Sequence, residues 1–85
     1  MASYKVLIKR SAAKELEDLP PKIRRRVAIR IQALGSDPRP PGAEKLSGQE
    51  KYRIRQGDYR VLYLIDDSSE SVTVMKVGHR RDVYR

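Results

Sequence analysis

Segment 52–63 constrains the fold of this 85-residue chain most strongly, because it has the pattern of a β-hairpin. The Gly-Asp pair at 57–58 is typical of a tight turn, and a turn there places Arg55 opposite Arg60. Side chains alternate between the two faces of a strand, so we expect Arg53, Arg55 and Arg60 to share one face. Three guanidinium groups in one patch repel one another. The hairpin therefore indicates a site for an anion such as phosphate.

The apolar pattern predicts four strand-like segments, two of which form this hairpin. Alternation indicates a first strand at 4–9, and strands at 50–56, 59–66 and 71–78 form a later meander. The 59–66 segment is apolar on both faces, which predicts a central position in the sheet. Segment 35–49 is rich in proline and glycine and is expected to be an irregular loop.

Two helices are expected between the first strand and that loop. Ser11 is a candidate N-cap for the first helix, which Pro20 terminates. Pro21 suits the first position of the second helix, and Gly35 its end. The second helix carries an apolar stripe made of Ile23, Val27, Ile31 and Leu34. We therefore expect a single α+β domain over 1–85: a small antiparallel sheet with a helical hairpin on one face, in the order β-α-α-β-β-β.

Composition limits the chemistry that the chain can perform. Lys and Arg number 19 against 11 Asp and Glu, and a net charge of +8 favours a nucleic acid or an acidic protein as partner. There is no cysteine and one histidine, which argues against disulfides and against cysteine- or histidine-rich metal sites. No phosphate-binding glycine loop, acidic magnesium cluster or serine–histidine–acid pattern is present. We therefore expect no metal and no cofactor, and, without a signal peptide or membrane-span pattern, a cytoplasmic location.

The tail after the last strand carries further candidate groups. Arg80 is expected near the Arg60 end of the sheet, and Tyr84 either stacks on a base or packs on the sheet edge. His79 is the side chain that titrates near neutral pH, and nearby positive charge favours its neutral, proton-accepting form, although a lone histidine is more often structural.

Other basic residues are expected to contribute less specifically. Lys51, Arg81 and Arg85 are candidate RNA-binding cations. The run 24–26 and Arg30 fan over a wide arc of the second helix, so we expect them on solvated faces, where they add long-range attraction to a polyanion.

Taken in order, these motifs resemble the RelE/ParE superfamily of bacterial and archaeal toxins over nearly the whole chain. The resemblance rests on the element order and on the motifs Leu19-Pro20, Lys45-Leu46, the 52–63 hairpin and the 77–85 tail. The RelE branch consists of ribosome-dependent endoribonucleases that cut mRNA in the decoding site and are neutralised by a cognate antitoxin. The resemblance implies that Arg53 and Arg55 lie near the scissile phosphate, that Arg60 and Arg80 match further basic site residues, and that Tyr84 stacks on the mRNA base.

One departure from the RelE pattern leaves the proton acceptor open. The archetypal RelE toxin has lysines at the positions of Arg53 and Arg55, and arginine is a poor general base. His79, Lys51 or the ribosome would then accept the proton of the attacking 2′-hydroxyl, while the arginines stabilise the phosphorane. The ParE branch shares the fold, inhibits DNA gyrase and usually lacks this basic and aromatic set. A purely regulatory member that binds an acidic partner is a third interpretation.

Overall fold

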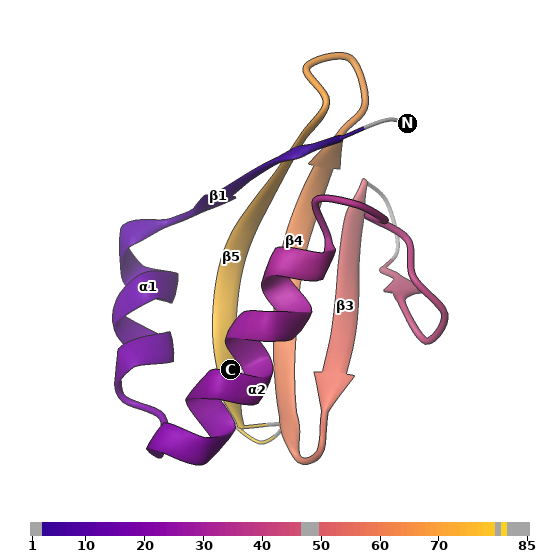
Figure 1. Ribbon diagram of the computed structural model, residues 1–85. Helices are drawn as coiled ribbons and strands as arrows, with labels where there is room; N and C mark the ends of the chain where they lie inside the picture. Colours follow the sequence, from indigo (N-terminus) through magenta and orange to yellow (C-terminus); the bar gives the residue numbers. More distant parts are fainter. Residues whose placement is uncertain (1–2, 47–49, 80, 82–85) are drawn as a thin grey trace.

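The computed structural model describes residues 3–46, 50–79 and 81, which form two helices and a five-stranded sheet (Figure 1). The expected α+β class and the helical hairpin on one face of the sheet are confirmed. In chain order the elements are β1 (Lys5–Ile8), α1 (Arg10–Glu17), α2 (Pro21–Ala33), β2 (Glu44–Lys45), β3 (Lys51–Gln56), β4 (Tyr59–Asp66) and β5 (Ser71–His79).

The sheet has the strand order β1-β5-β4-β3-β2, so β4 is central, as its two apolar faces predict. Neighbours from β2 to β5 are antiparallel, but β1 pairs with β5 in parallel, which makes the sheet mixed rather than wholly antiparallel. The reason is the helical hairpin. Because α2 returns the chain to the end where β1 begins, β3 runs in the direction of β1, and so does β5 two strands later (Figure 1).

The core lies between the helices and one face of the sheet. The stripe predicted for α2 is confirmed, with Val27, Ile31 and Leu34 buried and Ile23 partly buried. The sheet contributes residues that alternate with solvent-facing ones, as expected for one covered face. These buried sheet residues are Tyr52, Ile54, Val61, Tyr63, Ile65, Val72, Val74 and Val77.

The beginning of α1 differs from the prediction that Ser11 caps it. The helix begins at Arg10, and Lys9 occupies the N-cap position without a side-chain cap. The backbone explains this, because the N–H of Lys9 still donates to the carbonyl of Val74 in the sheet (3.0 Å) while its own carbonyl accepts from Ala13 (2.9 Å). The helix therefore starts directly from the last sheet contact of β1, which leaves no room for a separate capping residue.

A β-bulge in β5 changes the side-chain alternation of that strand. The β4–β5 register shifts between Leu62, paired with Lys76, and Tyr63, paired with Val74. Met75 is the additional residue, so that Val77 as well as Val74 faces the helices and is buried. Every residue of β5 after the bulge lies on the face opposite to the one that simple alternation predicts.

A carboxylate on α1 accepts a backbone hydrogen bond from the part of β5 that extends beyond the end of β1. The last pair between these strands joins Ile8 to Val74, and further along, the backbone N–H of Val77 donates to Oε1 of Glu15 (3.0 Å). Val77 is 2% exposed, so without Glu15 this N–H would lose its partner in a place that water reaches poorly.

We expect Glu15→Ala to lower the free energy of unfolding by about 1–2 kcal/mol, because it leaves this buried donor without an acceptor. Glu15→Gln retains an acceptor and should cost less. Glu17→Ala, at an exposed position of the same helix, is the control. Urea unfolding followed by circular dichroism measures the difference, and equal losses for the two alanine variants would contradict the role of Glu15.

Candidate functional site

Three arginines share the face of the sheet that points away from the helices, as predicted. In the β3–β4 pairing, Arg55 lies directly opposite Arg60, and Arg53 lies opposite Leu62. We call Arg53, Arg55 and Arg60 the arginine patch. Their strand neighbours, among them Ile54 and Val61, are buried on the other face.

The surroundings of the arginine patch are partly apolar and partly basic. Leu62 and Leu64 lie on the same face and are half-buried, which gives the patch an apolar border along β4. Lys51 is paired with Leu64 and so lies on this face too, two residues before Arg53. The structure thus brings together four of the cations that the sequence identified.

An acidic residue that the sequence analysis did not identify lies within the patch. Glu44 on β2 is paired with Arg53 on β3, and its carboxylate forms an ion pair with the Arg53 guanidinium. Its other oxygen, Oε1, lies 3.5 Å from Nη2 of Arg55. The side chain of Arg53 is 15% exposed and that of Arg55 is 53% exposed, so Glu44 joins a shielded cation to an open one.

The carboxylate of Glu44 offsets part of the repulsion among the arginines, which had suggested an external anion. It was missed because segment 35–49 looked irregular, although it contains the two-residue strand β2. A usable signal was present, since Glu44 is the single acidic residue of 38–49 and precedes the basic strand by a few positions.

His79 lies on the opposite face of the sheet from the arginine patch. It is paired with Tyr59, and the two rings meet edge-on with centroids 5.5 Å apart and planes at 83°. Gly78 is the residue opposite Arg60. The bulge at Met75 causes this placement, because it turns Val77 and His79 towards the helices. The structure therefore does not bring His79 together with the arginines.

The chain after β5 is described only at one position. The backbone N–H of Arg81 donates to Nδ1 of His79 (3.3 Å). Arg81 is exposed. Arg80, Tyr84 and Arg85 lie outside the described residues, so their roles remain predictions.

A cluster around Arg39 fastens the loop that leads into β2. The Arg39 guanidinium binds Asp67 (2.9 Å) and Glu50 (3.0 Å), its Nε donates to the hydroxyl of Tyr52 (3.0 Å), and its guanidinium carbon lies 5.3 Å from the centre of the Tyr52 ring. The hydroxyl of Tyr63 donates to the carbonyl of Pro38 (2.7 Å). These contacts hold the loop against β3, β4 and the β4–β5 turn, and so hold β2 beside the patch.

Ionisation in this cluster follows from the same contacts. Hydrogen bonds from Arg39 and from the hydroxyl of Tyr4 lower the pKa of Asp67. Hydrogen bonds from Lys45 and then Arg39 lower the pKa of Glu50. Burial raises the pKa of Tyr63 to about 12, so this phenol stays protonated and keeps its hydrogen bond at physiological pH.

Comparison with known proteins places this chain and its fold in a defined class. A family model described as the ParE toxin of the type II toxin–antitoxin system parDE matches residues 6–84. Toxin RelG of Mycobacterium tuberculosis is 35% identical over 86 residues, which cover 96% of this chain and 97% of that protein.

Solved structures agree with the sequence relatives. The archaeal RelE–RelB complex from Pyrococcus horikoshii matches with a TM-score of 0.84 and 30% identity, over 94% of this chain and 98% of that chain. The RelBE2 toxin–antitoxin complex from Mycobacterium tuberculosis matches with a TM-score of 0.80 and 31% identity, over 92% and 99%.

The chain belongs to the ParE/RelE family of type II toxin–antitoxin toxins and is of the RelE type. Within residues 3–46, 50–79 and 81, no three acidic, histidine or cysteine side chains are placed to hold a metal ion. The same residues contain no helix with the length and apolar character needed to cross a membrane.

Acid should weaken the cluster around Arg39. A carboxylate whose pKa is lowered by folding stabilises the protein above its unfolded pKa of about 4, and that contribution is lost as the pH falls through the lowered value. We expect Asp67→Asn to lower the melting temperature at pH 7 and to flatten its decline below about pH 4. Asp18→Asn, an exposed carboxylate after α1, is the control. Parallel melting-temperature profiles for Asp67→Asn and the unaltered chain would contradict this assignment.

Proposed function

We propose that this protein is an endoribonuclease that cleaves mRNA in the ribosomal A site by attack of a 2′-hydroxyl on the adjacent phosphate, without a metal ion. The observation that carries the proposal is the arginine patch, where Arg55 lies opposite Arg60 and near Arg53 on the face of the sheet that points away from the helices. Membership of the RelE type of toxin supports it. Cleavage inside ribosomes in turn implies a cytoplasmic toxin.

The exposures of the arginines suggest a division of roles. Arg53 is shielded and held by Glu44, so it is pre-oriented, whereas Arg55 is half-exposed and able to meet an incoming phosphate. Fixed guanidinium groups stabilise the charge that accumulates on the phosphorane without having to reorganise. Arg60 completes the patch from β4. We propose that Arg80 neutralises the leaving oxygen and that Tyr84 stacks on the base.

Glu44 is the proton acceptor that the geometry favours. Arginine cannot take the proton of the 2′-hydroxyl, and His79 lies on the other face of the sheet. Lys51 shares the face, but its ammonium would first have to lose a proton. A carboxylate can accept a proton directly, and that of Glu44 already lies between the two arginines that would hold the phosphate. The incoming phosphate would compete with Glu44 for Arg55 and leave this carboxylate next to the substrate.

The main experiment maps mRNA ends by primer extension in a translating extract that contains the protein. We expect cuts within codons at the A site, and a loss of at least about 100-fold in rate for Arg55→Ala, by analogy with the loss of an oxyanion-hole donor. Arg25→Ala removes an equal charge from α2 and should retain most activity. Intact mRNA with the unaltered protein would overturn the proposal.

Replacing Glu44 tests the proton acceptor separately. Glu44→Gln should lower single-turnover cleavage by about 10²–10⁴-fold, the usual contribution of a general base. RNA affinity should stay the same or rise, because one negative charge is removed from the patch. Glu17→Gln, which removes an exposed acidic group of α1, is the control. Normal cleavage by Glu44→Gln would exclude Glu44 as the base while leaving the arginine patch in place.

Inhibition of DNA gyrase is the second candidate function, favoured by the ParE description of the matching family model. It requires no chemistry from the patch, so the double variant Arg53→Ala with Arg80→Ala should then remain toxic in cells. Blocked supercoiling by purified gyrase, alongside intact mRNA, would support this function. If the double variant folds and is harmless, gyrase inhibition is excluded.

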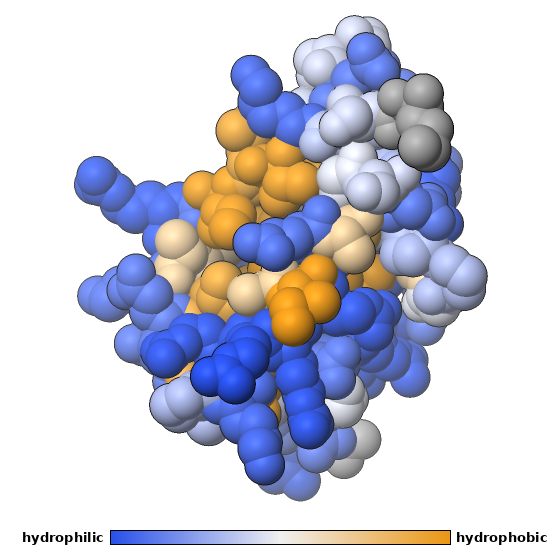
Figure 2. Space-filling view, in the orientation of Figure 1, coloured by the Kyte–Doolittle hydropathy of each residue, from blue (hydrophilic) through white to orange (hydrophobic). Residues whose placement is uncertain are grey.

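We also propose that a cognate antitoxin neutralises this protein. The two similar solved structures named above are toxin–antitoxin complexes. A partner for this chain needs acidic residues to offset the +8 charge and amphipathic segments to cover apolar surface. Such surface exists on β1, where Leu7 is 45% and Ile8 40% exposed, and a band of apolar residues lies between β1 and α2 (Figure 2).

A further inference from the structure

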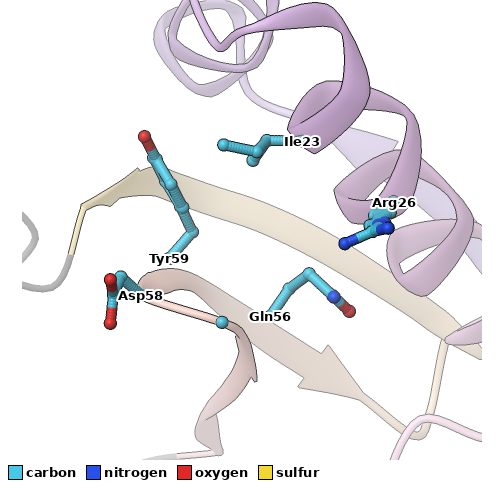
Figure 3. Close-up of a pocket in the computed structure, with 6 residues that line it drawn as sticks. Ile23, Arg26, Gln56, Asp58 and Tyr59 are labelled. Atoms are coloured by element: carbon cyan, nitrogen blue, oxygen red, sulfur yellow. The ribbon is translucent and has the colours of Figure 1, made fainter.

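A pocket of about 160 Å³ opens between α2 and the tip of the β3–β4 hairpin (Figure 3). Its position is defined by the hairpin, because Gln56 is paired with Tyr59 and these residues adjoin Arg55 and Arg60. The pocket therefore lies back to back with the arginine patch, on the other face of the sheet. Six residues line it: Ile23, Arg26, Gln56, Gly57, Asp58 and Tyr59.

The walls of the pocket combine a flat ring with groups that bind anions and carbonyls. In Figure 3 the side chains of Tyr59 and Ile23 stand next to each other on one side, and Arg26 extends from α2 on the other, above Gln56. The Tyr59 ring also meets the ring of His79 edge-on, with 5.5 Å between the ring centres. The Oε1 of Gln56 lies 3.5 Å from Nη1 of Arg30, and the NH₂ group of the same amide is a hydrogen-bond donor.

The helix that forms one side of the pocket is strongly basic. Segment 21–33 contains five Lys or Arg residues and no acidic residue. Hydrophilic residues gather over the lower, N-terminal half of α2 in Figure 2. Arg24, Arg25 and Arg26 are exposed, so this surface attracts a polyanion over a distance. Arg26 also lines the pocket, which sets it apart from a merely solvated charge.

We infer that this pocket binds an unstacked nucleobase of a single-stranded RNA, with the base against Tyr59 and Ile23 and its phosphate at Arg26. An aromatic wall, an amide donor and a guanidinium are groups with which proteins hold single-stranded RNA. An acidic protein segment fits less well, because it would use the cation but not the flat ring. The inference goes beyond the proposed cleavage and does not depend on it, since the pocket lies on the opposite face from the arginine patch.

The test uses the full chain and a five-nucleotide 2′-O-methyl RNA that carries one 2-aminopurine. This RNA lacks the hydroxyl needed for cleavage, so its binding is independent of the nuclease proposal. We expect quenching of the 2-aminopurine fluorescence and shifts of the backbone amide signals of residues 56–59 in nitrogen–proton NMR spectra. A Tyr59→Leu variant, which keeps an apolar side chain, should reduce the quenching.

Matched charge variants separate the pocket from general attraction. Arg26→Gln should weaken binding at least about threefold at roughly 0.1 M salt, whereas Arg24→Gln should change it little. Arg24 is on the same helix but donates to the carbonyl of Glu17 instead of lining the pocket. Arg55→Gln should leave the shifts at 56–59 intact.

Three results would overturn the inference. The first is equal weakening by Arg24→Gln and Arg26→Gln, and the second is amide shifts confined to the arginine patch. The third is a response of residues 56–59 to an acidic peptide but not to the RNA.

Discussion

The pairing of β3 with β4 in a single register is the interaction on which both faces of the sheet depend. Side chains alternate with a period of two, so a slip of one residue would turn the arginines into the core and the core residues into solvent. Gly57, with φ of 61°, permits the two-residue turn that fixes this register, and an L side chain would be strained there. The stacked rings of Tyr52 and Tyr63, 5.9 Å apart, reinforce the same pairing from the buried side.

The loop before β3 also shapes the arginine patch, because it brings an acidic residue to it. Arg39 fastens this loop to acidic residues and to Tyr52, and the fastened loop lays Glu44 next to Arg53. The free protein thus holds its own carboxylate against cations that would otherwise repel one another. A phosphate that enters the patch therefore displaces the carboxylate of Glu44 from Arg55. It does not neutralise a group of cations that had no counter-charge before. The free energy of phosphate binding is therefore less favourable than three arginines alone would suggest. The displaced carboxylate of Glu44 remains available beside the substrate.

Local patterns predicted most of the fold because they report on burial. The apolar stripe of α2, the hairpin register and the central place of β4 each follow from periodicity that one covered sheet face imposes. The prediction that Ser11 caps α1 was wrong, because a backbone hydrogen bond from Lys9 to the sheet determines where the helix begins. The parallel direction of β1 depends on where α2 returns the chain, which no local pattern encodes.

The site was less predictable than the fold, for two physical reasons. The bulge at Met75 reversed the facing of His79, and a single extra residue leaves no clear mark in the sequence. Glu44 entered the site through a strand of two residues within a segment rich in proline and glycine. Arg53, Arg55 and Arg60 were placed correctly because they belong to the hairpin, where alternation and turn chemistry agree. Their catalytic roles, like those of Arg80 and Tyr84, remain predictions.

The parallel pairing of β1 with β5 has a consequence for how the protein is made. It joins residues 5–8 to residues 71–74, so the edge strand β1 pairs with the strand that is last in chain order. Such a distant pairing closes slowly and late, because the loop between the partners must be ordered first. During synthesis β1 has no partner in the sheet until residues 71–74 have left the exit tunnel. A nascent chain that lacks residues 71–74 therefore has an incomplete sheet in which β1 is unpaired.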